Sequence, residues 1–243
     1  MGISSRKKFF ILSLFIVLTN HCLGNDSPII LSENFNHIPS SAIWTFSIND
    51  QYNIPYKRYP NRLHVAKAPY LINENSMCFY IPHLGDNYHD FRSEIAIKSI
   101  ESGLQERWYS EKIFIPRTWK ITDDRDIVLQ WHSWHREHGQ IHNNPPLSIC
   151  IEKTSWNICQ SYGDPITHKR VCGNLLGNVD FGNWTQWVIH IKWSVDDKGI
   201  VQIWKNNQLV FNKSGINTYF DHKYKTPYFK TGIYHPIWHQ KKK

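Results

Sequence analysis

From residue 91 onward, the chain is a succession of short segments in which polar and apolar residues alternate. A period of two is typical of strands that bury one face, and these segments are rich in the aromatic and β-branched residues that favour strands. No stretch shows an amphipathic helix longer than about three turns, and 11 Trp against two Met argue against a helical bundle. The segments predict strands over 91–100, 107–115, 125–132, 146–151, 186–194, 199–211 and 227–234.

A turn and a loop are visible between these segments. Asn206-Asn207 divides the segment 199–211 and predicts a tight hairpin turn. Residues 132–146 are rich in His, Asn and Pro and predict a long loop that follows a strand. No repeat or linker divides the chain, and 243 residues suit one all-β domain. We therefore expect a single antiparallel two-sheet sandwich or jelly roll over residues 25–243.

Residues 1–24 have the pattern of a secretory signal peptide. The basic residues 6–8 precede an apolar run over 9–18, and the small residues Cys22 and Gly24 stand before the expected cleavage site. The apolar run is too short to span a bilayer, so an uncleaved anchor is the weaker interpretation. We expect a secreted, extracellular protein that has no membrane contact after cleavage.

The charge of the chain argues against a nucleic-acid partner. The formal net charge is +8, and removal of the three basic residues of the signal peptide lowers it to +5. Three of the remaining positive charges belong to the terminal lysines 241–243. The body of the protein is therefore only mildly basic, unlike a dedicated nucleic-acid-binding domain.

The cysteines fit an oxidising compartment. Four remain after the signal peptide, which allows up to two disulfides in three connectivities. Cys150 and Cys159 flank the turn-like stretch EKTSWN, and we expect that they close a hairpin. The spacings are not those of a zinc site. The other two cysteines are Cys78 and Cys172, and sequons for glycosylation begin at Asn25, Asn183 and Asn212.

Polar side chains share one face on each of three predicted strands. Because alternate residues of a strand point to the same side, each stripe can be read from the sequence. Charged stripes on aromatic-rich strands are unusual for a core, and they would suit a groove for a polar, anionic ligand. The three stripes are Arg92 with Glu94, Gln130 with His132, and Tyr228 with Lys230 and Tyr234.

The segments FRSE (91–94), LQWH (129–132) and YFKTGIY (228–234), in this order, resemble the jelly-roll polysaccharide lyases. These include the heparin lyase I, glucuronan lyase and alginate lyase groups. Residues 182–210 are also similar to the family's segment between its second and third motifs, and the resemblance covers about residues 60–236. It implies a concanavalin A-like β-jelly roll and a lyase that acts on an anionic polysaccharide containing uronic acid. The short chain is more similar to glucuronan lyases than to heparin lyase I.

Lyase chemistry assigns roles to these side chains. β-Elimination removes the C5 proton of a uronic acid, and the charge that develops next to its carboxylate must be stabilised. Arg92 and Gln130 can bind that carboxylate. His132 is suited to be the base and Tyr234 the acid that protonates the leaving O4, although a nearby cation would let Tyr234 act as base too.

The remaining polar residues of the stripes are expected to support or bind the substrate. Lys230 supplies a cation, and Glu94 orients Arg92. Tyr228 and Trp131 are candidate contacts to the sugar. In glucuronate the C5 proton and O4 lie on the same side, so Tyr234 alone could serve as base and acid. In iduronate or guluronate they lie on opposite sides, so His132 would be the base.

Other readings of the same residues stay open. A lectin-like, non-catalytic sandwich could bind the same sugars. A glycoside hydrolase would need two carboxylates across the site, and the motifs hold only Glu94. Metal binding is a further alternative, and its ligands would be His132, His135, His138 and His142. Separately, Gln140 and His142 also fit the Gln-x-His pattern, although Gln130 and His132 are preferred because they end a hydrophobic strand.

The resemblance also leaves some properties open. Ala96 stands where the alginate branch often carries a further Arg, which argues against alginate. We expect no catalytic cofactor or metal. Some relatives bind a structural calcium ion, but no DxDxDG-like loop is present. We expect a monomer.

Overall fold

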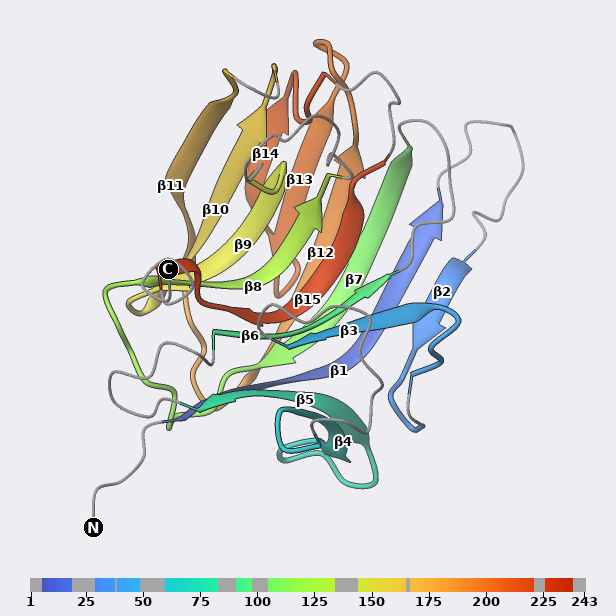
Figure 1. The fold of residues 1–243 in the computed structure, drawn as a ribbon, viewed down its shortest axis with the longest axis vertical. Coiled ribbons are helices and arrows are strands. Elements are labelled where there is room, and N and C mark those ends of the chain that lie inside the picture. Colours follow the sequence, from blue (N-terminus) through green and yellow to red (C-terminus); the bar gives the residue numbers. More distant parts are fainter. Residues whose placement is uncertain are drawn as a thin grey trace.

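Two antiparallel β-sheets pack face to face in the computed structural model (Figure 1). It describes residues 6–18, 29–37, 39–48, 60–82, 91–97, 105–133, 144–164, 167–220 and 226–237. All fifteen elements named in these ranges are strands. The all-β sandwich expected from the sequence is therefore confirmed.

The first sheet has eight strands and runs in the order β14-β13-β12-β7-β1-β5-β4, with β2 paired to β1. Its strands are β1 (Arg6–Leu18), β2 (Ile29–Glu33), β4 (Leu63–Lys67), β5 (Asn75–Pro82), β7 (Glu106–Phe114), β12 (Trp184–Lys192), β13 (Ile200–Lys205) and β14 (Gln208–Ser214).

The second sheet has seven strands in the order β11-β10-β9-β8-β15-β6-β3. Three consecutive central strands, β8, β15 and β6, are the strands that carry the polar motifs. The strands are β3 (Trp44–Ile48), β6 (Arg92–Ile97), β8 (Arg125–His132), β9 (Leu147–Glu152), β10 (Ser155–Tyr162), β11 (Lys169–Asn178) and β15 (Tyr228–Tyr234).

The predicted strands agree closely with the observed ones. The segment 125–132 is β8 without any change of bounds, and 227–234 differs from β15 by one residue. The expected hairpin turn between β13 and β14 is confirmed, because Asn206 and Asn207 both have positive φ, at 50° and 66°. Two consecutive residues of this kind are what a type I′ turn requires.

The hydrophobic core lies between the two sheets. Bulky side chains from both sheets fill it, and the largest fully buried ones are aromatic. Trp131 of β8 lies 5.1 Å, centroid to centroid, from Tyr109 of β7, so this contact crosses from one sheet to the other. Trp156 of β10 and Trp187 of β12 form a second contact of this kind, at 5.2 Å. These contacts join the two sheets across the core.

Strand β1 coincides with the apolar run of the predicted signal peptide. In the structure it lies between β5 and β7 and pairs with both. Cleavage after Gly24 would remove this strand from the folded chain, so the signal peptide remains a prediction. Among the described residues, no helix is long and apolar enough to cross a membrane.

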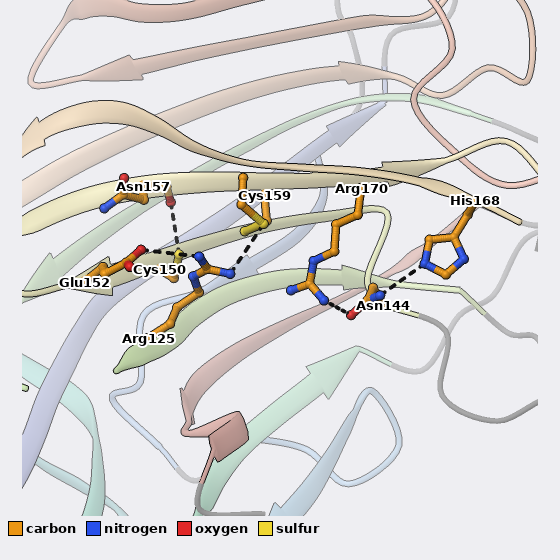
Figure 2. Close-up of a disulfide and its surroundings, with 9 residues drawn as sticks. Arg125, Asn144, Cys150, Glu152, Asn157, Cys159, His168 and Arg170 are labelled. Carbon is orange, nitrogen blue, oxygen red and sulfur yellow. Dashed lines mark hydrogen bonds and ion pairs between the residues drawn. A yellow bond between two sulfur atoms is a disulfide. The ribbon is translucent and has the colours of Figure 1, made fainter. Parts of the chain in front are cut away.

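The disulfide joins two cysteines that the sequence did not pair. Cys159 of β10 lies directly opposite Cys172 of β11, with 4.1 Å between their Cα atoms, and the two are bonded (Figure 2). The predicted Cys150–Cys159 bond is therefore wrong. Cys150 lies opposite Asn157 instead, to whose carbonyl oxygen its Sγ donates at 3.4 Å. Cys78 and Cys150 are buried and form no disulfide.

A buried carboxyl group lies in the core behind the motif strands. Glu111 of β7 is almost fully buried. Burial raises its pKa from 4.5 to about 8, and the nearby hydroxyl of Thr231 lowers it by less. The folded protein therefore holds Glu111 as a neutral acid at pH 7, although the unfolded chain would ionise it.

We expect Glu111→Gln to stabilise the protein at neutral pH. Between about pH 4.5 and 8 the folded state binds more protons at Glu111 than the unfolded state does, so stability falls as pH rises. The slope that Glu111 contributes is up to about 1.4 kcal/mol per pH unit. Urea unfolding at pH 4 and pH 7.5 measures this contribution. The free energy of unfolding of the variant should exceed that of wild type only at the higher pH. Equal differences at both pH values would contradict this assignment.

Candidate active site on the seven-stranded sheet

The polar motifs meet on the face of the second sheet that points away from the core. Lys230 of β15 lies opposite Gln130 of β8 on one side and Ala96 of β6 on the other. Residues directly opposite each other in a sheet share a face. Their chain neighbours Leu129, Phe229 and Ile95 belong to the core. The outer face of β6, β15 and β8 therefore carries the three polar stripes side by side.

Glu94 is the centre of a cluster that joins all three strands. Its Oε2 binds Lys230 Nζ at 2.6 Å and Arg92 Nε at 3.1 Å, and its Oε1 accepts a hydrogen bond from Gln130 Nε2. The expectation that Glu94 orients Arg92 agrees with this geometry. The cluster contains two cations and one carboxylate, and it is buried although it lies on the outer face.

Burial and mutual charge set the protonation of this cluster. Burial raises the pKa of Glu94, but Lys230 and Arg92 together lower it below its ordinary value, so Glu94 is an anion. The pKa of Lys230 is lowered to about 8, mainly by burial. The negative charge of Glu94 raises this pKa, and the positive charge of Arg92 lowers it. At pH 7 the cluster therefore keeps one positive charge in excess, which suits a carboxylate ligand.

Gly232 provides the space in which Glu94 lies. It stands opposite Glu94 in the sheet, with φ of 149°, where other residues are strained. A Cβ at this position would lie 2.5 Å from Glu94 Cα and closer still to the carbonyl oxygen of Ser93. Because no side chain fills this position, Lys230 can reach diagonally across it to the carboxylate.

His132 is held as a neutral base at one end of the cluster. Its Nδ1 lies 3.0 Å from the carbonyl oxygen of Ser133, which only accepts, so Nδ1 carries the proton and Nε2 the lone pair. Burial and, to a lesser extent, the positive charge of Lys230 lower its pKa to about 4. The imidazole is therefore unprotonated over most of the pH range.

The two tyrosines lie at opposite ends of the same strand. Tyr234 lies opposite Arg92 in the sheet, and the Arg92 guanidinium is 4.3 Å from the centre of its ring. Tyr228 lies opposite His132, with 5.7 Å between ring centres. Tyr234 is thus the phenol beside the predicted carboxylate-binding residue, and Tyr228 is the phenol beside the predicted base. The rings of His132, Tyr228 and Tyr234 are half-buried, and they form the accessible part of the site.

Trp131 is not a sugar contact. It is fully buried and packs against Tyr109 and Phe229 in the core. The period of two explains this: Gln130 and His132 point outward, so Trp131 between them points inward. The sequence-based assignment of Trp131 to substrate binding is therefore wrong.

Comparison with known proteins gives the family. The model of the family described as polysaccharide lyase matches residues 43–243. The chain belongs to the polysaccharide lyase family. Comparison of the sequence with curated proteins gives no significant match. The resemblance stated from the three motifs is thus confirmed, and so is the enzyme class that it implied.

Two solved structures are similar to this lyase in fold. An endo-β-1,4-glucuronan lyase from the fungus Trichoderma reesei has a TM-score of 0.64 and 16% identity, covering 83% of this chain and 87% of its own. The alginate lyase PA1167 from Pseudomonas aeruginosa has a TM-score of 0.51 and 12% identity, covering 81% of this chain and 89% of its own. At such identities the likeness shows the fold, which is the expected jelly roll.

Sequence reasoning missed a residue that positions Arg92 in this lyase. Arg62 precedes β4, and its guanidinium donates to the carbonyl oxygens of Tyr80 at 2.9 Å and Arg92 at 3.2 Å. The Ser93 hydroxyl donates back to the Arg62 carbonyl oxygen at 2.7 Å. Arg62 thus ties the first sheet to the start of β6. It lies 30 residues from Arg92 and bonds to main-chain atoms, so no side-chain pattern could indicate it.

No group of three or more His, Cys, Asp or Glu side chains suited to a metal ion occurs among the described residues of the lyase. The alternative metal ligands His135, His138 and His142 lie outside those residues, as does Gln140. The described part of the site is the cluster around Glu94, with His132 and the two tyrosines at its ends.

Proposed function

We propose that this lyase is secreted and cleaves a polymer of uronic acid by β-elimination, and that its substrate is a β-1,4-linked glucuronan. The observation that carries the proposal is the Glu94 cluster, because it places an excess positive charge between a neutral histidine and a tyrosine. The likeness to the glucuronan lyase in fold supports this substrate over alginate, and so does Ala96, which lies opposite Lys230.

In the proposed mechanism the uronate carboxylate binds at the Glu94 cluster. Arg92 and Gln130 donate hydrogen bonds to it, and the charge of Lys230 stabilises the electrons that move toward it as the C5 proton leaves. The group that acts at C5 must stand beside the group that holds the C5 carboxylate. Tyr234, in contact with Arg92, meets this requirement.

The proton transfers follow the stereochemistry of the sugar. On glucuronate, Tyr234 as phenolate takes the C5 proton, the C4–C5 double bond forms, the C4–O4 bond breaks, and Tyr234 returns the proton to O4. The Arg92 guanidinium stabilises the negative charge on its oxygen. On an epimer with the opposite C5 configuration, His132 Nε2 takes the proton and Tyr234 protonates O4.

An absorbance assay tests the proposal. The purified protein is incubated separately with glucuronan, heparin, heparan sulfate and alginate, and the ultraviolet absorbance of the unsaturated product is followed. We expect the fastest rise with glucuronan. A rise with another polymer alone would overturn the substrate, and no rise with any of the four would overturn the reaction.

The pH dependence of kcat/KM should reflect His132 and Lys230. On a polymer with the opposite C5 configuration, for which His132 is the base, we expect an acid limb near pH 4, where His132 becomes protonated. On that polymer and on glucuronan alike we expect an alkaline limb near pH 8, where Lys230 loses its charge. In Lys230→Met the alkaline limb should disappear and the acid limb remain. On the polymer with the opposite C5 configuration, an acid limb near 6.5, the ordinary histidine value, would contradict the described surroundings of His132.

Secretion has its own test. If the signal peptide is removed, mass spectrometry of the protein from the culture medium should show a chain that begins close to Asn25. A secreted chain that retains residues 6–18 would show instead that β1 is part of the mature fold.

A further inference from the structure

A second basic group lies on the outer face of the seven-stranded sheet, at its β11 edge. Arg170 of β11 is exposed, and its Nη1 donates to Oδ1 of Asn144 (Figure 2). Asn144 is held in turn by two contacts. Its Nδ2 lies 3.1 Å from His168 Nε2, and its carbonyl oxygen accepts a hydrogen bond from Tyr219 Oη at 2.7 Å. The guanidinium of Arg170 is thus held in place by a polar cluster.

The register of the sheet places Arg170 in line with the catalytic residues. Successive direct pairs lead from Gln130 through Ser148 and Cys159 to Cys172. Neighbouring strands are antiparallel, so His132, two residues after Gln130, and Arg170, two residues before Cys172, lie on the same side of this row. Three strand spacings separate them, which is about 14 Å across the sheet.

The charge at this edge is not balanced. Arg125, from the start of β8, extends over the face to Cys172, with Nη1 3.4 Å from its Sγ, and meets Glu152 at 3.3 Å (Figure 2). Glu152 pairs with Arg125, and it is the one carboxylate on the outer face of β8 to β11 among the described residues, so the charge of Arg170 has no carboxylate of its own on this face. Although the Arg170 side chain is exposed, partial desolvation of its guanidinium lowers its pKa below the ordinary value, and the charge of Arg125 lowers it too. This excess of positive charge resembles that of the Glu94 cluster.

We propose that Arg170, fixed by Asn144 and accompanied by Arg125, binds an anionic group of the substrate at a sugar unit further along the chain than the cleaved bond. The proposal rests on the proposed function, because it takes the polymer to cross the strands from β15 toward β11. The ligand chemistry is a carboxylate or sulfate, which a guanidinium binds in bidentate fashion. The disulfide Cys159–Cys172 keeps β11, the edge strand, joined to β10 beneath this position.

Binding measurements on two matched variants test the proposal. Lys169 precedes Arg170 on β11, has the same charge and is exposed, but by the period of two it points to the other side of the strand. In a Tyr234→Phe background, which slows cleavage by about 10²- to 10⁴-fold, we expect Arg170→Ala to raise the Kd for glucuronan by about three- to tenfold, the worth of one ordinary hydrogen bond. Lys169→Ala should leave the Kd within about twofold.

Three further measurements identify the contact. Arg170→Lys should restore part of the affinity. The effect of Arg170→Ala should shrink at 1 M salt, where the Debye length is about 3 Å. The loss of kcat/KM in active protein should be greater on polymer than on the shortest cleavable oligomer. Thermal unfolding of each variant shows whether the fold is intact.

The outcomes separate this proposal from the proposed function. If Arg170→Ala lost affinity for both glucuronan and heparan sulfate, the ligand would be a carboxylate. If it lost affinity for heparan sulfate alone, the ligand would be a sulfate. Equal Kd values for Arg170→Ala and Lys169→Ala in a protein that cleaves a polyuronate would overturn the second binding position alone. Absence of cleavage with every polymer would overturn the proposed function, whereas weaker binding by Arg170→Ala would still support an anion site.

Discussion

Tyr234→Phe should lower kcat on the cleaved polymer by about 10²- to 10⁴-fold, the usual contribution of a general acid or base. The phenylalanine keeps the ring that packs against Arg92 and Phe91, so the loss reports on the hydroxyl alone. Polymer binding should change by less than about threefold, which is within the worth of one neutral hydrogen bond. Initial rates of ultraviolet absorbance measure kcat, and titration with polymer measures binding.

Tyr228→Phe is the matched control for this variant. It removes the same hydroxyl from the other end of β15, beside His132. We expect an effect mainly on KM, because Tyr228 is assigned to substrate binding. If Tyr228→Phe abolished turnover and Tyr234→Phe did not, the acid would be Tyr228, and the proposed roles would have to be exchanged.

Gly232→Ala should abolish activity and destabilise the fold by about 3 kcal/mol or more, as severe backbone strain and overpacking do. The added methyl group would meet Ser93 and Glu94 main-chain atoms, which cannot move away as a flexible side chain can. Either β15 separates from β6, or Glu94 leaves the position in which it binds Lys230 and Arg92. Urea unfolding and the absorbance assay measure the two effects.

Gly215→Ala is the control for backbone conformation. Gly215 also has a positive φ, of 109°, but its added methyl group would meet nothing within 4 Å. The free energy of unfolding of Gly215→Ala should fall by about 1–3 kcal/mol because of strain, and its kcat should not change. If both variants lost activity equally, the glycine requirement would be one of backbone conformation, and the space for Glu94 would not matter.

Local pattern was sufficient to find much of the candidate active site. The period of two assigns Arg92 and Glu94 to one face of their strand, and Gln130 and His132 to one face of theirs, whatever lies beside them. The same rule should have excluded Trp131, because it stands between two outward residues. Its aromatic side chain suggested a sugar contact, but a residue between two outward-facing neighbours points inward, so Trp131 packs in the core.

Some strands could not be found from their sequence. β11 contains Gly173 and Gly177, both with positive φ, and its pairing with β10 is interrupted by irregularities. Such a strand does not alternate regularly. Its place beside β10 depends on the hairpin that joins them, and the disulfide partner of Cys159 follows from that register.

The sequence by itself determined the fold class, the family and the types of side chain on the outer face, because alternation and motifs depend on residues close together in the chain. Only the tertiary structure decided which strands are neighbours. Pairing of β15 with both β6 and β8 brings Lys230 and Gln130 to Glu94, and pairing across β9 to β11 aligns Arg170 with His132. Strand order and register are set by packing over the whole sheet, so distant residues become neighbours only when the core is complete.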